Sequence, residues 1–125
     1  MIIPCEIAVK SVVPAIRAAM AKELVEKYSL KQNEVAEALG ISQSAVSKYT
    51  RQVRGHVIKI DDIEEIQPLI DNMINLLMDE DPTRAEILSL FCQTCMTIRK
   101  KGLMCQFCQK TDPKIEIEEC SVCLT

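Results

Sequence analysis

The sequence predicts an all-α protein. Apolar residues recur every three to four positions through most of the chain, which is the spacing of amphipathic helices. The three glycines fall where such helices would end rather than inside them. Six of the seven cysteines lie in the last 34 residues, which sets this end of the chain apart. We therefore expect three parts, residues 1–60, 61–90 and 91–125, in a chain long enough for one small domain with an appendage.

The predicted helices follow one another with short connections. They are Ser11 to about Tyr28, Gln32–Leu39, Gln43 to about Val53 before Gly55, a helix opened by Pro68, and one opened by Asp81 and Pro82 that runs to Lys101. Ser11 and Ser42 have the side chains of N-caps, and Gly40 and Gly102 can take the left-handed backbone that ends a helix. After Gly102 we expect short loops with a brief strand at Ile115–Glu118. His56–Ile60 is expected to be a short extended stretch.

Residues 32–53 have the pattern of a helix-turn-helix unit. Ala36 is small where two helices must cross closely, and Gly40 suits the tight turn between them. Apolar contacts between the helices are expected from Val35, Leu39, Ile41, Val46 and Tyr49. The outer face of the second helix carries short polar side chains that can enter a major groove, namely Gln43, Ser44, Ser47 and Lys48, then Arg51. An ordinary helical hairpin is the alternative interpretation.

These residues also carry a resemblance to a known family. Gln32, Ala36, Gly40, Ile41, Val46 and Tyr49 stand as they do in phage-repressor-like (XRE-type) helix-turn-helix domains. The segment from Pro4 to Gly55 resembles the N-terminus of predicted archaeal transcriptional regulators of this type. Those proteins also carry a Cys-containing tail, which Phe91–Cys105 resembles, and the resemblance is weakest after Cys108. It implies sequence-specific binding of a double-stranded DNA operator, usually as a homodimer.

The resemblance also implies which residues contact DNA. The base-reading face would consist of Gln43, Ser44, Ser47 and Lys48, and the phosphate contacts would come from Gln32, Thr50, Arg51 and Arg54. Phosphate contacts position a protein without carrying sequence information, so we expect Gln43, Ser44 and Ser47 to dominate specificity. Solvated charge on an exposed helix is the alternative interpretation of Lys48, Arg51 and Arg54.

Three CxxC pairs mark the last part of the chain. They are Cys92/Cys95, Cys105/Cys108 and Cys120/Cys123. Two residues between thiolates let both sulfurs reach one metal ion or cluster, so all six are candidate ligands, with the first two pairs favoured as the primary set. An iron–sulfur cluster is favoured because six or seven cysteines exceed one zinc site, and structural zinc or a metal-free dithiol are the alternatives. Arg99 and the two lysines after it would favour thiolates. Cys5 is isolated and is expected to be a buried apolar filler.

Charge is distributed unevenly along the chain. Residues 1–60 have nine basic and five acidic side chains, residues 61–91 have one and nine, and residues 92–125 have five and four. A basic module followed by an acidic one fits a binder of polyanions with a separate association segment. The acidic part carries an apolar stripe of Ile63, Ile66, Ile70, Ile74 and Leu77. This stripe predicts a dimer interface or, alternatively, packing against the chain's own core.

Several classes of protein are disfavoured. The chain has a single His, no Ser/His/Asp or Cys/His constellation and no glycine-rich phosphate loop, so we expect neither an enzyme nor a small-molecule substrate. No apolar run approaches the roughly 18 residues that span a bilayer, and the start of the chain lacks the pattern of a signal peptide. A reducing, cytoplasmic compartment is therefore expected.

The sequence thus predicts a helix-turn-helix DNA-binding domain (1–60), a helical coupling or dimerisation segment (61–90) and a small Cys-rich metal-binding tail (91–125). The expected function is a DNA-binding transcriptional regulator whose Cys-ligated centre senses redox or metal state. The main alternatives are a small iron–sulfur redox protein that does not bind DNA, and a DNA-binding regulator with purely structural zinc.

Overall fold

The structure is a computed structural model of the chain, and it describes residues 3–51, 58–60, 63–79 and 84–124. Every regular element in these ranges is a helix, which confirms the predicted all-α class. The elements are α1 (Pro4–Lys10), α2 (Val12–Glu26), α3 (Gln32–Leu39), α4 (Gln43–Thr50), α5 (Gln67–Leu77), α6 (Arg84–Lys100), α7 (Cys105–Thr111) and a short 3-10 helix, η1 (Val122–Leu124). None of the helices in the described ranges is long and apolar enough to cross a membrane.

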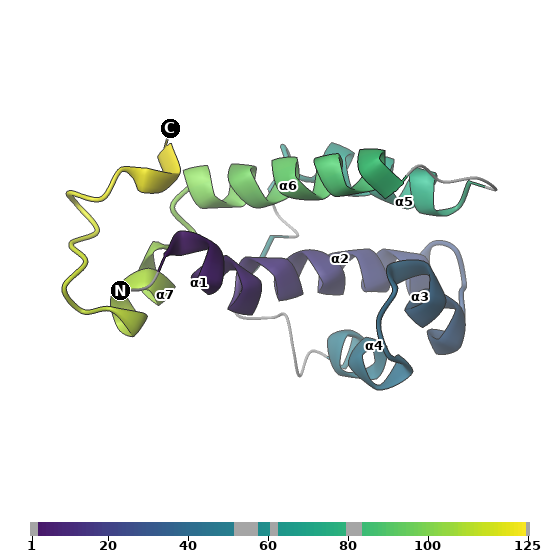
Figure 1. Cartoon of the computed structure of the whole chain (residues 1–125). Helices are drawn as coiled ribbons and strands as arrows, with labels where there is room; N and C mark the ends of the chain where they lie inside the picture. Colours follow the sequence, from purple (N-terminus) through teal and green to yellow (C-terminus); the bar gives the residue numbers. More distant parts are fainter. Residues whose placement is uncertain (1–2, 52–57, 61–62, 80–83, 125) are drawn as a thin grey trace.

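Helix α2 is the centre of the molecule. It contacts α1, α3, α4, α5 and α6, and Figure 1 shows it running through the middle, with α5 and α6 along one side and α3 and α4 on the other. Its buried residues are Val12, Ala15, Ile16, Met20, Ala21 and Leu24. A helix that buries more than one face belongs inside a bundle, which explains its position. One hydrophobic core runs from Ile7 to Met104 and includes residues of all three predicted parts.

The start of the fold differs from the prediction. Helix α1 was not expected, and it begins at Pro4, whose missing N–H costs nothing in a first turn. Ser11 does not cap α2 with its side chain. It is buried, and its Oγ donates a hydrogen bond to the carbonyl oxygen of Ile7 at 2.8 Å. Ile7 and Ala8 are buried in the core, and this tertiary packing explains why a seven-residue helix forms here.

The prediction was accurate around the turn between α3 and α4. Helix α3 has the predicted bounds, and Gly40 after it has a left-handed φ of 68°. The Oγ of Ser42 accepts a hydrogen bond from the backbone N–H of Ala45 at 3.1 Å, as an N-cap should. Helix α4 ends at Thr50. Its predicted extension to Val53, the stop at Gly55 and the first part of the extended stretch lie outside the described residues.

Helices α5 and α6 form a pair that covers one side of α2. Helix α5 opens at Gln67 and Pro68 as predicted. Ile66, Ile70 and Ile74 are almost fully buried in the chain's own core, so the apolar stripe is not an exposed face for a second copy. The stripe therefore packs against the chain's own core, which was the alternative to a dimer interface. Helix α6 ends at Lys100 and is followed by Gly102 with φ 76°, whereas its predicted opening at Asp81 and Pro82 lies outside the described residues.

The tail was predicted least well. The expected loops after Gly102 include helix α7 and the 3-10 helix η1. The predicted strand at Ile115–Glu118 is wrong, because the described chain forms turns there and offers no strand with which an isolated segment could pair. Met104 is the last buried residue, and none of residues 105–123 is buried. This segment is held by contacts of η1 with α6 and of α7 with α1.

Candidate DNA interface and cysteine clusters

Helix α4 is anchored on one side and open on the other. Val46 is fully buried and Tyr49 is 6% exposed, and they pack with Val35 and Ala36 of α3 into the core below α2. Successive residues in a helix turn by about 100°, so residues 43, 44, 47, 48 and 51 lie together on the opposite side. The core therefore fixes the direction in which the polar face of α4 points.

The residues expected to read bases are all on this face. Gln43 and Ser44 are exposed, and Ser47 and Lys48 are half-buried at its edges. Short polar side chains of this kind leave room for the edges of base pairs. The structure thus brings the four predicted base-reading residues together on one accessible surface.

The predicted phosphate contacts are placed less uniformly. Gln32 is exposed at the first position of α3, and Arg51 is exposed at the end of α4. Thr50 is half-buried, and its Oγ1 donates a hydrogen bond to the carbonyl oxygen of Ser47 at 3.1 Å. The Nε of Arg51 donates to the same oxygen at 3.3 Å, which leaves the two Nη groups of Arg51 for a ligand. Arg54 lies outside the described residues.

Two short helices joined through a left-handed glycine, the second with an exposed polar face, define a helix-turn-helix unit, a class of structure that presents a helix to DNA. A protein-family model described as helix-turn-helix (HTH_3, the XRE type) matches residues 22–56, which span the end of α2, α3 and α4. This match supports a DNA-binding regulator and does not extend to the cysteine tail. No curated protein and no solved structure matches the chain.

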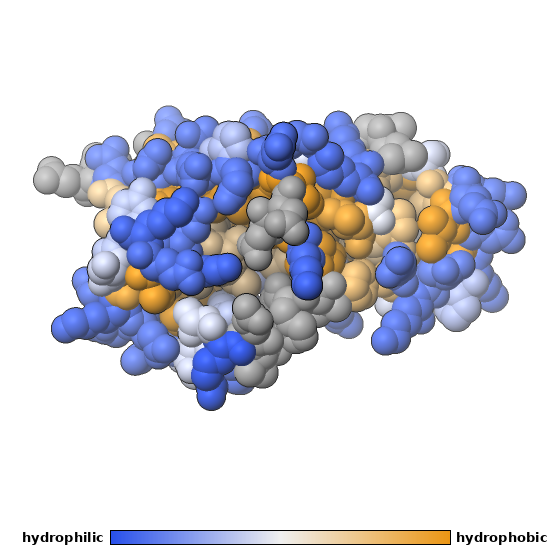
Figure 2. All heavy atoms as spheres, turned by 180° about the vertical axis from the view of Figure 1, so that it is seen from behind, coloured by the Kyte–Doolittle hydropathy of each residue, from blue (hydrophilic) through white to orange (hydrophobic). Residues whose placement is uncertain are grey.

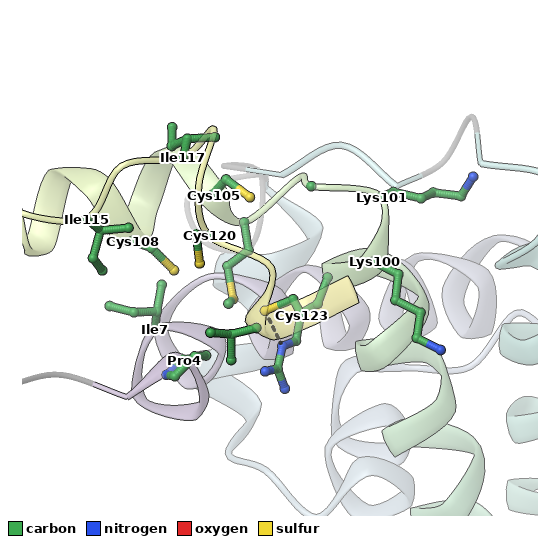
Figure 3. Close-up of a pocket in the computed structure, with 14 residues that line it drawn as sticks. Pro4, Ile7, Lys100, Lys101, Cys105, Cys108, Ile115, Ile117, Cys120 and Cys123 are labelled. Atoms are coloured by element: carbon green, nitrogen blue, oxygen red, sulfur yellow. Dashed lines mark hydrogen bonds between the residues drawn. The ribbon is translucent and has the colours of Figure 1, made fainter. Parts of the chain in front are cut away.

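The structure divides the seven cysteines into two groups. We call the first the tail cluster, and it consists of Cys105, Cys108, Cys120 and Cys123. All four line one cavity of about 370 Å³, and Figure 3 shows their side chains arranged around it. The cavity is also lined by apolar side chains of α1 and the tail, among them Ile7, Ile115 and Ile117, and by the basic residues Arg99, Lys100 and Lys101. Figure 2, which views the molecule from behind, shows apolar surface reaching this end, at the right.

The second group, which we call the helix group, consists of Cys92 and Cys95 on α6 and Cys5 on α1. Cys5 is exposed, so the expectation of a buried filler is wrong. It lies on the side of α1 opposite Ile7, two residues further on, because two positions turn a helix by about 200°. Burial raises the pKa of the Cys95 thiol, Arg99 opposes this, and the charges of Cys92 and Cys5 add to it. Cys5 thus has a small electrostatic influence on the Cys95 thiol.

Arg99 lies between the two groups. Its Nε donates a hydrogen bond to the sulfur of Cys123 at 3.3 Å, drawn as a dashed line in Figure 3, and its Nη1 donates to the sulfur of Met96 at 3.5 Å. Burial raises the pKa of the Cys108 thiol, and the neighbouring Cys123, Cys105 and Cys120 raise it further, while Arg99 lowers it. The thiols of the tail cluster are therefore close enough to influence one another, with one guanidinium beside them.

The structure tests which cysteines are brought together. In the described part of the chain, no three Cys, His, Asp or Glu side chains stand close enough to hold a metal ion as they are. The predicted primary set is not assembled, since Cys92 and Cys95 do not line the cavity that Cys105 and Cys108 share with the third pair. Spacing alone could not choose between the pairs. A usable signal was Asp112-Pro113, a turn sequence that can reverse the chain between the second and third pairs.

Proposed function

We propose that this protein is a sequence-specific, non-enzymatic DNA-binding transcriptional regulator of the cytoplasm that reads its operator with α4. The observation that carries the proposal is the exposed polar face of α4, opposite the buried Val46 and Tyr49. Gln43 has the amide that pairs with adenine, and Ser44 and Ser47 can donate to or accept from several bases. Lys48 would complete this base-reading face, and Gln32, Thr50, Arg51 and Arg54 would contact phosphates and set the register of α4 in the groove.

The regulator would act as a homodimer, because two copies of a helix-turn-helix read two half-sites of an operator. The apolar stripe of α5 is buried within the chain, so the interface would use other surfaces. Met78 and Leu88 on the α5–α6 pair are large apolar side chains with 43% and 55% exposure, which supports this side as a candidate. Light scattering after size-exclusion chromatography, with and without DNA, measures the oligomeric state directly. A single copy on a half-site would contradict the dimer.

The tail would carry a Cys-ligated centre that senses redox or metal state, with an iron–sulfur cluster favoured and zinc as the alternative. A route for coupling exists in the packing. Element η1 contacts α6, α6 contacts α5 and α2, and α2 contacts both helices of the helix-turn-helix unit. An ion pair between Lys101 Nζ and Glu65 Oε2, 2.6 Å apart, joins the end of α6 to the segment before α5. Loss of the centre would thus change the position of α4 through the packing of α6 and α2.

The experiment that tests DNA binding selects an operator from a random duplex library and measures affinity by fluorescence anisotropy at several salt concentrations. We expect binding that weakens steeply with salt. Ser47→Glu places a carboxylate against bases and phosphates and should lower operator affinity by at least about 100-fold, as the loss of one or two good base contacts would. Ser89→Glu makes the same change at an exposed position of α6 and is the matched control.

Circular dichroism of both variants separates loss of binding from loss of fold. Unchanged operator affinity in a folded Ser47→Glu protein would contradict the assignment of α4. A chain that holds a reducible iron–sulfur cluster and shows no salt-dependent DNA binding would favour the alternative function, a small redox protein with the helix-turn-helix as its scaffold.

A further inference from the structure

We infer that Cys105, Cys108, Cys120 and Cys123 form one four-thiolate metal site, and that Cys5, Cys92 and Cys95 take no part in it. This inference rests on the Cys-ligated centre of the proposed function and names its ligands, but it is independent of DNA binding. It replaces the primary set of Cys92, Cys95, Cys105 and Cys108 that was predicted from the sequence.

The backbone of the tail brings two CxxC pairs to one cavity. Cys105 and Cys108 lie three residues apart in the first turn of α7, so their side chains share a face. The chain then turns back at Asp112, whose Oδ1 accepts from the N–H of Lys114 at 3.2 Å and whose carbonyl oxygen accepts from the N–H of Ile115 at 3.0 Å. Gln109 Nε2 also donates a hydrogen bond to the carbonyl oxygen of Ile115 at 3.4 Å, and this bond holds the returning segment against α7.

The third pair completes the arrangement from the other side. Cys120 precedes η1 and Cys123 lies within it, and both line the same cavity as the α7 pair. Paired CxxC sequences facing each other are a common way to surround one thiophilic ion with four sulfurs. In the described part of the chain no three such side chains hold an ion as they stand, so metal binding would have to turn these four half-exposed side chains toward one ion in the cavity around which Figure 3 shows them.

The tail has little apolar burial of its own. None of residues 105–123 is buried, whereas every longer helix of the chain contributes buried residues to the core. Phe107, Cys108 and Cys123 pack against the core only in part, and such partial burial offsets little of the entropy of ordering about 20 residues. Four metal–thiolate bonds stabilise such segments in small metal-binding domains. The apolar lining from Ile7, Ile115 and Ile117 would shield the bonds from water.

The electrostatics fit the same assignment. A divalent ion with four thiolates carries a net charge of −2, and Arg99, Lys100 and Lys101 line the cavity. The hydrogen bond from Arg99 Nε to the sulfur of Cys123 is the kind of contact that orients a ligand and tunes the metal. Arg99 is in this sense a positioning residue, and lysine cannot reproduce its planar geometry.

The helix group is built differently. Cys92 and Cys95 lie inside α6, Cys92 is exposed, and neither side chain lines the cavity. Ile98, in the last turn of α6, is fully buried in the core, so the core holds the end of this helix in place. Because neither Cys92 nor Cys95 lines the cavity, we leave this pair out of the tail site.

Purification without oxygen, followed by elemental analysis and absorption spectra, tests the assignment. We expect a metal in the wild-type chain and in Cys92→Ser/Cys95→Ser, and at least a tenfold lower content in Cys105→Ser/Cys120→Ser. Colourless protein with zinc and brown protein with iron and sulfide distinguish the two thiophilic centres. Metal retained in the tail variant, or lost from the helix variant, overturns the inference. So does a metal-free wild-type chain that takes up neither zinc nor iron with sulfide.

A second measurement uses the wild-type chain alone and does not depend on how the variants fold. Iodoacetamide labelling with and without the metal, mapped by mass spectrometry, should show protection of the four tail-cluster cysteines while Cys5 and Cys92 react. Protection of Cys92 and Cys95 instead would contradict the assignment. Arg99→Lys should weaken metal retention against a chelator about tenfold or more, as loss of an outer hydrogen bond does. Operator affinity of the same preparations is measured separately, so loss of DNA binding with the metal retained would count only against the proposed function.

Discussion

The helix-turn-helix unit and the cysteine tail have similar lengths but opposite construction. The unit of α3 and α4 buries Val35, Ala36, Val46 and Tyr49 and ends its helices with local hydrogen bonds. The tail from Cys105 onward has two short helical elements and buries nothing fully. Apolar burial holds the first region in place, and this leaves its outer face free for polar side chains. The second region keeps its cysteines half-exposed around a cavity, which is what a site completed by a ligand requires.

The difference predicts that removal of the metal affects only one of the two regions. Structural thiolate sites contribute on the order of 10 kcal/mol of binding energy to the segments that they order. Stripping the ion with a chelator should therefore expose residues 105–124 to limited proteolysis while α3 and α4 stay protected. Mass spectrometry of the fragments checks this. Equal protection of the tail before and after chelation would show that apolar contacts suffice there.

A matched pair of valines tests the same contrast by burial. Val46 of α4 is 0% exposed and Val122 of η1 is 59% exposed. Val46→Ala should lower the free energy of unfolding by about 1.5–3 kcal/mol, since a buried valine side chain is lost from the core. Val122→Ala should change it by less than about 0.5 kcal/mol. Urea denaturation of both variants measures the difference, and similar losses would remove the distinction between the two regions.

The same contrast explains what could be predicted from the sequence. The bounds of α3, the left-handed Gly40 and the cap at Ser42 depend on residues within one helical turn, so local rules were enough. Helix α1 depends on the packing of Ile7 and Ala8 against α2, and no local sequence pattern predicts that contact. The buried stripe of α5 shows the same limit, because a stripe facing its own core and a stripe facing a partner have the same spacing.

In the tail, the CxxC spacing identified the cysteines as candidate ligands but not which pairs come together. Three identical CxxC pairs offer three ways to choose two, and only the backbone between them decides which pairs meet. The alternation at Ile115–Glu118 imitated a strand because nothing in a single segment tells whether a neighbouring strand exists. Cys5 was expected to be a buried filler because it is isolated in the sequence, and only the fold shows that it is exposed on α1. The candidate DNA-binding face could be predicted from the sequence of one helix, whereas the grouping of the cysteines could be seen only in the whole fold.

A smaller effect is expected at the cap of α4. The Oγ of Ser42 accepts a hydrogen bond from the N–H of Ala45 at 3.1 Å and so caps the first turn of α4. Ser42→Ala should lower the free energy of unfolding by about 1 kcal/mol and leave metal content unchanged. Ser89→Ala, at an exposed position of α6 outside the proposed metal site, is the control. Chemical denaturation and elemental analysis report the two quantities, and an effect on metal content would link the regions more closely than their packing indicates.

The smallest expected effect concerns the pH dependence of the junction between α2 and α5. Burial raises the pKa of Glu23 above its ordinary value of 4.5, the carboxylate of Asp71 on α5 adds to this, and Lys27 opposes it. Glu23 also accepts hydrogen bonds from Gln67 at 3.3 Å and Lys27 at 3.4 Å. Because the folded chain holds this proton more tightly, its stabilisation is complete below pH 4.5 and is lost as pH rises through the raised pKa.

Glu23→Gln should therefore leave stability near pH 4 almost unchanged and increase it at pH 7. The gain should be below about 1 kcal/mol, since the exposed Lys27 partner contributes little to stability and is lost with the charge. Glu26→Gln, exposed on the same helix, is the control. Urea titrations between pH 4 and 7 should show the Glu23→Gln and wild-type curves separating as pH rises. Parallel curves would mean that the carboxylates of Glu23 and Asp71 do not repel each other across the junction of α2 and α5.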